Sequence, residues 1–231
     1  RTFDFKTIGE YENLLFNFPY IRQVVISPDN NKNFLLLKNL VKRNKNVQFE
    51  IMVNETCIND CSIRKFHLIE DELVLETIKN FHCKSFCNKK FMNNKAEALS
   101  KMKVIYPWEI KEYSKIGVKN FKICGRDKIA YVTGEYLKNI ELYLLGIDDV
   151  KNIENIPIKC FNNNVITVNY FNFLIKDIKA YLPNINHFKK HGHECASNCG
   201  VNCNYCRKCA EKIEKVYKKI YEKEKERAGE I

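Results

Sequence analysis

Cysteine content constrains this chain more than any other feature of its sequence. Eleven of the 231 residues are cysteines, an odd number that cannot all pair as disulfides within one chain. Nine of the eleven fall into two tight groups, and residues 1–5 show no apolar core of a secretion signal. Clustered thiols in such a chain are typical of metal centres, so we expect metal sites in place of a disulfide framework.

The first cysteine group consists of two Cys-x3-Cys pairs formed by Cys57, Cys61, Cys83 and Cys87. It begins directly after an expected strand at 47–53, and the loops that follow strands carry the sites of parallel α/β folds. Four thiolates suit a 4Fe–4S cluster or a structural zinc ion, and the x3 spacing favours the cluster. His67 and His82 are candidates to replace a thiol or to support one.

The second group packs five thiols into fifteen residues, namely Cys195, Cys199, Cys203, Cys206 and Cys209. Spacing alone does not select four of the five, and we take the first four as ligands because Cys209 falls on the following helix. His191 and His193 lie just upstream, and their participation would favour zinc over a cluster. A metal here would pin the terminal helix to the rest of the protein.

Apolar patterning predicts an α/β fold built on a parallel sheet. Residues 22–27 are an expected strand, 34–41 a helix and 47–53 the next strand, which is the repeating unit of such a sheet. The alternation continues with a strand at 104–106, a helix at 108–116, a strand at 118–124 and an amphipathic helix at 128–145.

We divide the chain into residues 1–150, an α/β part with a cysteine-rich insertion at 54–90, and residues 151–231. The second part combines a connecting region, a strand at 165–168, the second cysteine group and a charged helix at 208–227. Only about four strands fit a barrel, whereas a closed (β/α)8 barrel needs eight. The fold is therefore either an incomplete barrel or a smaller open sheet.

Charge and hydropathy bear on partners and location. The formal net charge of +11 favours polyanions such as RNA, although alternating acids and bases on the terminal helix are also typical of a solvated face. No stretch approaches the roughly twenty apolar residues needed to span a bilayer. We expect a soluble, cytoplasmic protein with no membrane partner.

Three stretches of the chain share motifs with a known family. They are Val53-Asn54-Glu55-Thr56-Cys57-x3-Cys61-x2-Arg64-x2-His67, Gly117-Val118-Lys119-Asn120-Phe121-Lys122-Ile123-Cys124-Gly125-Arg126, and the tail that ends in Cys203-Asn204-Tyr205-Cys206. The chain resembles the collagenase-like peptidase U-32 family on these residues. The second stretch is close to that family's Gly-Val-x-Ser-x-Lys-Ile-Glu-Gly-Arg signature.

The resemblance implies an incomplete TIM-like barrel, of which this chain supplies the C-terminal half, with a 4Fe–4S cluster held by cysteines. An N-terminal half or a partner chain would complete the barrel. Some members of the family resemble oxygen-independent hydroxylases that modify RNA bases or a small aromatic precursor. One departure matters, because Cys124 stands where the family has Glu, so an acid role there is lost. Cys124 is then either a cluster ligand or a buried thiol.

Substrate-binding and catalytic candidates follow from position and charge. Arg126 would sit at the mouth of the sheet, where its guanidinium suits a phosphate or carboxylate, and Arg64 and Lys122 are further candidates. Asn54 and Glu55, at the end of their strand, would position substrate or cluster. An ordinary ion pair is the competing interpretation of Arg126.

We thus expect an iron–sulfur enzyme that modifies RNA or a small aromatic substrate, with one or two clusters. A peptidase-like hydrolase is one alternative, although no Gly-x-Ser-x-Gly or His-Glu-x-x-His motif supports it. A non-enzymatic zinc module that binds nucleic acid through its charge is another. The sequence does not decide whether Cys124, Cys160 or Cys209 is a ligand.

Overall fold

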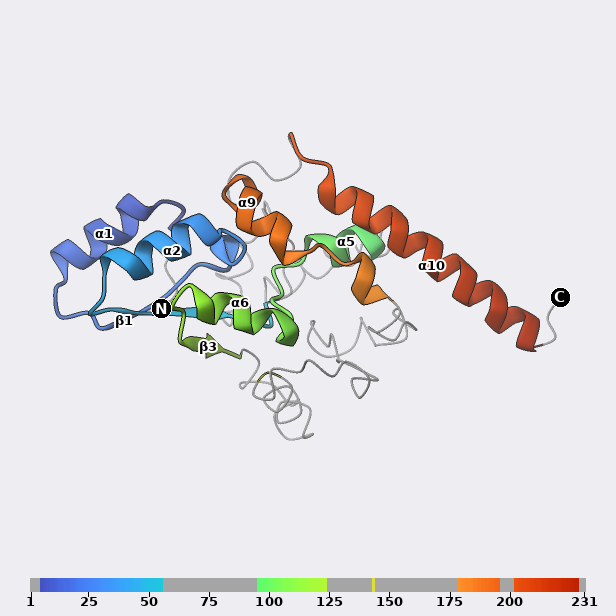
Figure 1. Ribbon diagram of the computed structural model, residues 1–231, viewed down its shortest axis with the longest axis horizontal. Coiled ribbons are helices and arrows are strands. Elements are labelled where there is room, and N and C mark those ends of the chain that lie inside the picture. Colours follow the sequence, from blue (N-terminus) through green and yellow to red (C-terminus); the bar gives the residue numbers. More distant parts are fainter. Residues whose placement is uncertain (1–4, 56–94, 124–142, 144–177, 196–201, 229–231) are drawn as a thin grey trace, which may run out of the picture.

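A three-stranded parallel sheet forms the centre of the protein (Figure 1). The computed structural model describes residues 5–55, 95–123, 143, 178–195 and 202–228. Strands β1 (Gln23–Val25), β2 (Gln48–Met52) and β3 (Asn120–Lys122) lie side by side in the order of the sequence. Val24 pairs with Phe49, and Ile51 pairs with Phe121. The predicted α/β class with a parallel sheet is confirmed, and the sheet is open in the described part of the chain.

The β1–α2–β2 unit forms as the patterning predicts. Helix α2 (Phe34–Arg43) starts at the cap residue Asn33, whose side chain accepts a hydrogen bond from the Leu36 N–H at 3.1 Å. Its buried apolar face includes Leu37 and Leu40, which are both fully buried against β1 and β2. The apolar face predicted from the helical spacing of this segment is therefore buried in the structure.

Helix α1 (Ile8–Asn17) precedes this unit and was not predicted. Thr7 and Glu10 form a reciprocal capping box at its start, a local signal that the sequence does contain. Tyr11 is fully buried, and its hydroxyl accepts a hydrogen bond from the Ser27 N–H at 3.1 Å. The helix is thereby attached to the chain that leaves β1.

The predicted strand at 104–106 is wrong. Ile105 N–H donates to the Val53 carbonyl at 2.8 Å, just beyond the end of β2, but no strand ladder forms there. Side chains satisfy the neighbouring carbonyls, since Asn31 Nδ2 donates to Lys103 O at 3.1 Å and the Tyr143 hydroxyl donates to Ile105 O at 2.8 Å. This segment crosses the end of the sheet instead of joining it.

The segment then turns into β3 through two short helices. A 3-10 turn, η3 (Pro107–Glu109), leads into α6 (Ile110–Lys115), where a single helix at 108–116 was predicted. Gly117 ends this region with φ of 96°, and a Cβ there would lie 2.6 Å from Val41 Cγ1. The glycine thus supplies both a left-handed turn and the space that α2 needs.

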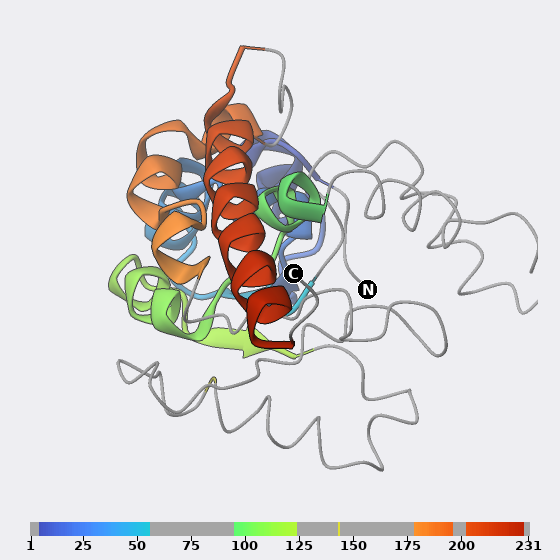
Figure 2. The ribbon, with the colours of Figure 1, turned by 90° about the vertical axis from the view of Figure 1, so that its right-hand side faces the viewer.

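Besides the 3-10 turn η1 (Pro28–Asn30) after β1, three helices and a short turn complete the described fold. They are α5 (Lys95–Lys101), the 3-10 turn η7 (Lys179–Tyr181), α9 (Ile185–Cys195) and α10 (Tyr205–Ala228). Helix α10 runs beside α5 and then extends away from the rest of the protein (Figures 1 and 2). It starts three residues before the predicted position. Within the described residues, no helix combines the length and the apolar character that crossing a membrane requires.

Helix α9 packs across α2 and the chain that follows β1. Gly192 makes this approach possible, because a Cβ at that position would lie 1.7 Å from the Lys32 carbonyl oxygen. Phe188 and Cys195 from the same helix join the hydrophobic core. The predicted helix at 128–145, apart from Tyr143, the strand at 165–168 and the boundary near residue 150 lie outside the described residues.

Candidate metal centre

The carboxyl ends of β2 and β3 place three predicted site residues at one edge of the sheet. Met52 pairs with Lys122, and the Val53 N–H donates to the Lys122 carbonyl at 3.0 Å. Asn54 and Glu55 follow directly, and like Lys122 they are partly buried. Two of the three predicted catalytic residues, Asn54 and Glu55, and one predicted substrate-binding residue, Lys122, therefore leave the sheet from neighbouring strands. The third catalytic candidate, Arg126, lies outside the described residues.

A buried polar segment, which sequence reasoning missed, supports this edge. It follows β1 at residues 27–33, and Asn31 Nδ2 donates to Met52 O at 2.7 Å as well as to Lys103 O. Asp29 forms an ion pair with Lys103, whose side chain is 1% exposed. Burying two charges is costly unless they are paired. This ion pair therefore holds the segment after β1 and the segment around Lys103 together at the end of the sheet.

Other predicted site residues lie outside the described residues. These are Cys57, Cys61, Cys83 and Cys87 of the first cysteine group, Cys199 of the second, and Arg64 and Arg126. The chain reaches Cys57 two residues after Glu55, and Cys124 two residues after Lys122. Their assignment as ligands or substrate contacts stays a prediction. His67, His82, Cys124 and Cys160 also lie outside the described residues.

Four cysteines of the second group lie at the end of α9 or near the start of α10. Cys195 ends α9 and is buried in the core, whereas Cys203 and Cys206 are partly buried at the start of α10. Cys209 lies on α10, as predicted, and is 8% exposed. Among the described residues no group of three or more His, Cys, Asp or Glu side chains is arranged to hold a metal ion.

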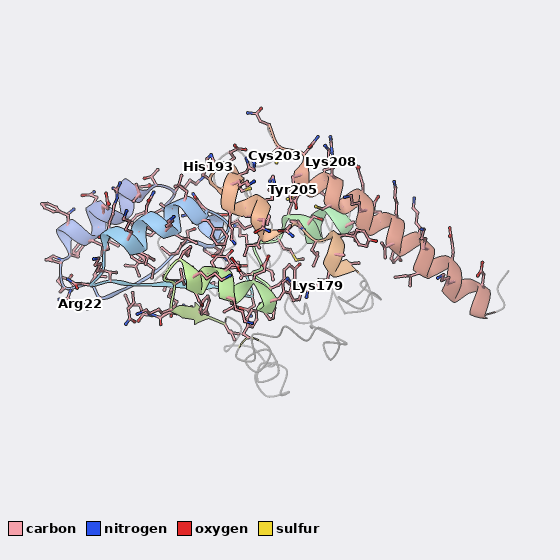
Figure 3. All side chains as sticks on the ribbon, in the orientation of Figure 1. Arg22, Lys179, His193, Cys203, Tyr205 and Lys208 are labelled. Carbon is pink, nitrogen blue, oxygen red and sulfur yellow. The ribbon has the colours of Figure 1, made fainter. Side chains whose placement is uncertain are left out.

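His187 contacts this group and was missed by the sequence analysis. Its Nε2 lies 3.9 Å from Cys203 Sγ, and its ring stacks on Tyr205 with centroids 3.7 Å apart and planes 13° apart. Figure 3 shows Cys203 and Tyr205 where the chain enters α10, next to α9. The available signal was the four-residue spacing of His187 and His191, which places two imidazoles on one helix face.

Local electrostatics keep His187 neutral and Cys209 protonated. Burial lowers the pKa of His187, and the neighbouring His191 lowers it further, so the ring offers a lone pair near neutral pH. Burial raises the pKa of the Cys209 thiol, although a hydrogen bond with Tyr205 opposes this. Thiolates are the metal-binding form, so Cys209 is less suited to be a ligand than a solvated cysteine.

Tyr205 holds the junction together. Its hydroxyl accepts a hydrogen bond from the Asn184 N–H at 2.9 Å, which joins α10 to the chain entering α9. Burial raises the pKa of this hydroxyl. His191 and His193, the two histidines singled out in the sequence, are exposed, and each lies 3.8 Å from Glu194. The His187 imidazole and the Cys203 thiol are thus close enough to bind the same metal ion.

Comparisons of this chain with protein-family models, with curated proteins and with solved structures gave no match.

Proposed function

We propose that this protein is an iron–sulfur enzyme of the U-32 peptidase-like type that modifies RNA or a small aromatic substrate by oxygen-independent hydroxylation. The observation that carries the proposal is the adjacency of β2 and β3, joined beyond their ends by the hydrogen bond between Val53 and Lys122. The segments that follow β2 and β3 each reach a cysteine within a few residues of this edge, at Cys57 and at Cys124. Sites of parallel α/β folds lie at this edge.

Strand order supports the incomplete TIM-like barrel. Barrels are wound by adding each parallel strand beside the previous one, and β1, β2 and β3 follow that order. Three strands in this order also occur within one half of a doubly wound sheet, which reverses its order only at a switch point. Further strands, from another part of the protein or from a partner chain, are required to close such a barrel.

The chemistry of the donor set fits a 4Fe–4S cluster. Cys57, Cys61, Cys83 and Cys87 would hold it, and the cluster would supply electron transfer when bound. Glu55 and Asn54 would position the substrate next to it. Lys122, with Arg126 and Arg64, would bind the substrate's phosphate or carboxylate.

Metal analysis of protein purified without oxygen tests this proposal. We expect about four irons and four acid-labile sulfides per chain, with a broad absorption band near roughly 400 nm. Cys57→Ser should remove most of the iron, whereas Cys160→Ser, outside both groups, should not. Trials with RNA and aromatic acids under reducing conditions then test the activity. Zinc without sulfide after anaerobic reconstitution would refute the cluster.

The contact between His187 and Cys203 favours zinc as the occupant of the second cysteine group. Their separation of 3.9 Å is near the roughly 3.5 Å that separates nitrogen and sulfur ligands on a tetrahedral zinc. A structural zinc here would lock α10 to α9. His187→Ala should then lower the zinc content and leave the iron unchanged, with the exposed His193→Ala as its control. Unchanged zinc in His187→Ala would exclude this ligand.

A further inference from the structure

A pocket of about 440 Å³ opens between η3 and the segment that leads into α9. Tyr106 and Trp108 form one wall, and Asn184 and Ile185 contribute to the other. Tyr106 directly follows Ile105, which is bonded to the chain just beyond β2. The pocket therefore lies next to the sheet edge where the proposed function places the chemistry, and its size is within the range of small-molecule sites.

One wall is an aromatic stack with a cation held against it. Trp108 lies nearly parallel to Tyr106, with ring centroids 4.7 Å apart. Lys179 Nζ lies 4.6 Å from the Trp108 ring centroid. In the described part of the chain, no carboxylate forms an ion pair with Lys179. A partly buried ammonium that is held by a ring, and not by a carboxylate, can accept an anion.

The opposite wall is the start of helix α9. The Asn184 side chain caps this helix by accepting a hydrogen bond from the Asn186 N–H at 2.8 Å, and the His187 N–H donates to the Asn184 carbonyl at 3.0 Å. Ile185, the first residue of α9, lines the pocket. The N-terminus of a helix carries partial positive charge and favours anions, so this wall reinforces the charge of Lys179.

Glu109 completes the wall and is compatible with an anion nearby. Its side chain lines the pocket, is 7% exposed and accepts a hydrogen bond from the Tyr106 N–H at 2.8 Å. Burial raises its pKa to about 7, against the pull of that hydrogen bond and of Lys32. A carboxyl group that is protonated for much of the time near neutrality does not repel an anionic ligand and can donate a hydrogen bond to it.

We infer that this pocket binds a small organic anion that carries an aromatic ring. Its carboxylate or phosphate would lie between Lys179 and the start of α9. Its ring would contact the apolar walls formed by Trp108, Leu182 and Ile185. The inference deepens the proposed function and rests on it only for the natural ligand, which would be the substrate itself.

The experiment uses Trp108, the only tryptophan of the chain, as a reporter inside the pocket. Benzoate, adenosine monophosphate and inorganic phosphate would be titrated against the purified, metal-replete protein. Tryptophan emission, excited at the red edge of its absorption, and calorimetry would be recorded together. We expect a saturable emission change with benzoate or with adenosine monophosphate, and the stronger of the two identifies the preferred head group. Inorganic phosphate alone should bind more weakly.

Two lysine variants make the test specific. Lys179→Met should weaken binding by about tenfold or more, as the loss of one charge-assisted hydrogen bond does. Lys190→Met, which changes an exposed lysine of α9 that does not line the pocket, should bind like the unchanged protein. Equal affinities of the two variants would overturn the inference, as would no saturable signal or equal binding of inorganic phosphate and the preferred organic anion.

Iron content measured in the same samples separates the two proposals. Probe binding without iron refutes the iron–sulfur function and leaves the anion pocket standing. A full cluster without probe binding does the opposite.

Discussion

In the sheet unit, defined as β1 to β3 with α2 and α6, main-chain hydrogen bonds and apolar burial fix each element. Val24, Leu37 and Ile51 are 3%, 0% and 0% exposed. Helices α9 and α10 pack on α2 and α5, respectively, but their own junction depends on a few side-chain contacts, above all the stacked rings of His187 and Tyr205. Most of the α10 side chains that the structure describes are exposed or partly exposed.

This difference indicates where a metal would matter most for stability. The sheet edge is positioned by backbone hydrogen bonds, including the one from the Val53 N–H to the Lys122 carbonyl, so the sheet itself holds Asn54, Glu55 and Lys122 there. The junction around Cys203 rests on side chains, and a bound ion would add a large share of its stability there. A metal in the second group would be structural, and one at the sheet edge is the candidate for chemistry.

The largest expected effect comes from the core of the sheet unit. Leu37→Ala should lower the free energy of unfolding by about 2–5 kcal/mol, because it removes a fully buried side chain and leaves a cavity. Leu35→Ala, on the same helix but 56% exposed, should change it by less than about 0.5 kcal/mol. Urea unfolding measures both. Similar losses in the two variants would mean that α2 does not pack on the sheet as described.

The next largest effect on the free energy of unfolding is expected at Glu109, in η3. Since its pKa in the folded protein is about 7 and its ordinary value is 4.5, the folded state holds the proton more tightly. The free energy of unfolding should therefore fall as pH rises from 4.5 to 7, by about 3 kcal/mol in all, and level off above.

Glu109→Gln should remove that pH dependence and retain the hydrogen bond from the Tyr106 N–H. Unfolding at a series of pH values, for the unchanged protein and the variant, measures the contribution. Parallel curves for the two proteins would show that Glu109 does not titrate as its burial requires.

A smaller effect tests how α9 is seated on the sheet unit. Gly192→Ala should destabilise the protein by about 1–3 kcal/mol, because its Cβ would meet the Lys32 carbonyl and force α9 away. Gly9→Ala, in α1 with nothing within 4 Å of its Cβ, should instead stabilise the protein by about 0.5–1 kcal/mol. The melting temperature should fall in Gly192→Ala and rise in Gly9→Ala, and thermal unfolding of the two variants measures both shifts. A neutral Gly192→Ala would contradict the close approach of α9.

The sequence pattern predicted those elements whose buried residues recur at regular spacing along the chain. Strands β1 and β2, helix α2 and helix α10 were assigned within a few residues, because a buried face repeats with the period of the element. The segment at 104–106 has the apolar character of a strand, but the Tyr143 hydroxyl donates to the Ile105 carbonyl, and Asn31 Nδ2 donates to the Lys103 carbonyl just before it. Apolar content indicates burial and does not specify which partner satisfies the backbone.

The sequence by itself determined the α/β class and the two cysteine groups, since both depend on periodicity and spacing along the chain. Only the tertiary structure brought His187 to Cys203, and joined Trp108 to Lys179 and the start of α9 in one pocket. The residues of that pocket lie about seventy positions apart in the sequence. Contacts between such distant residues are set by how helices pack on the sheet, and no local pattern encodes them.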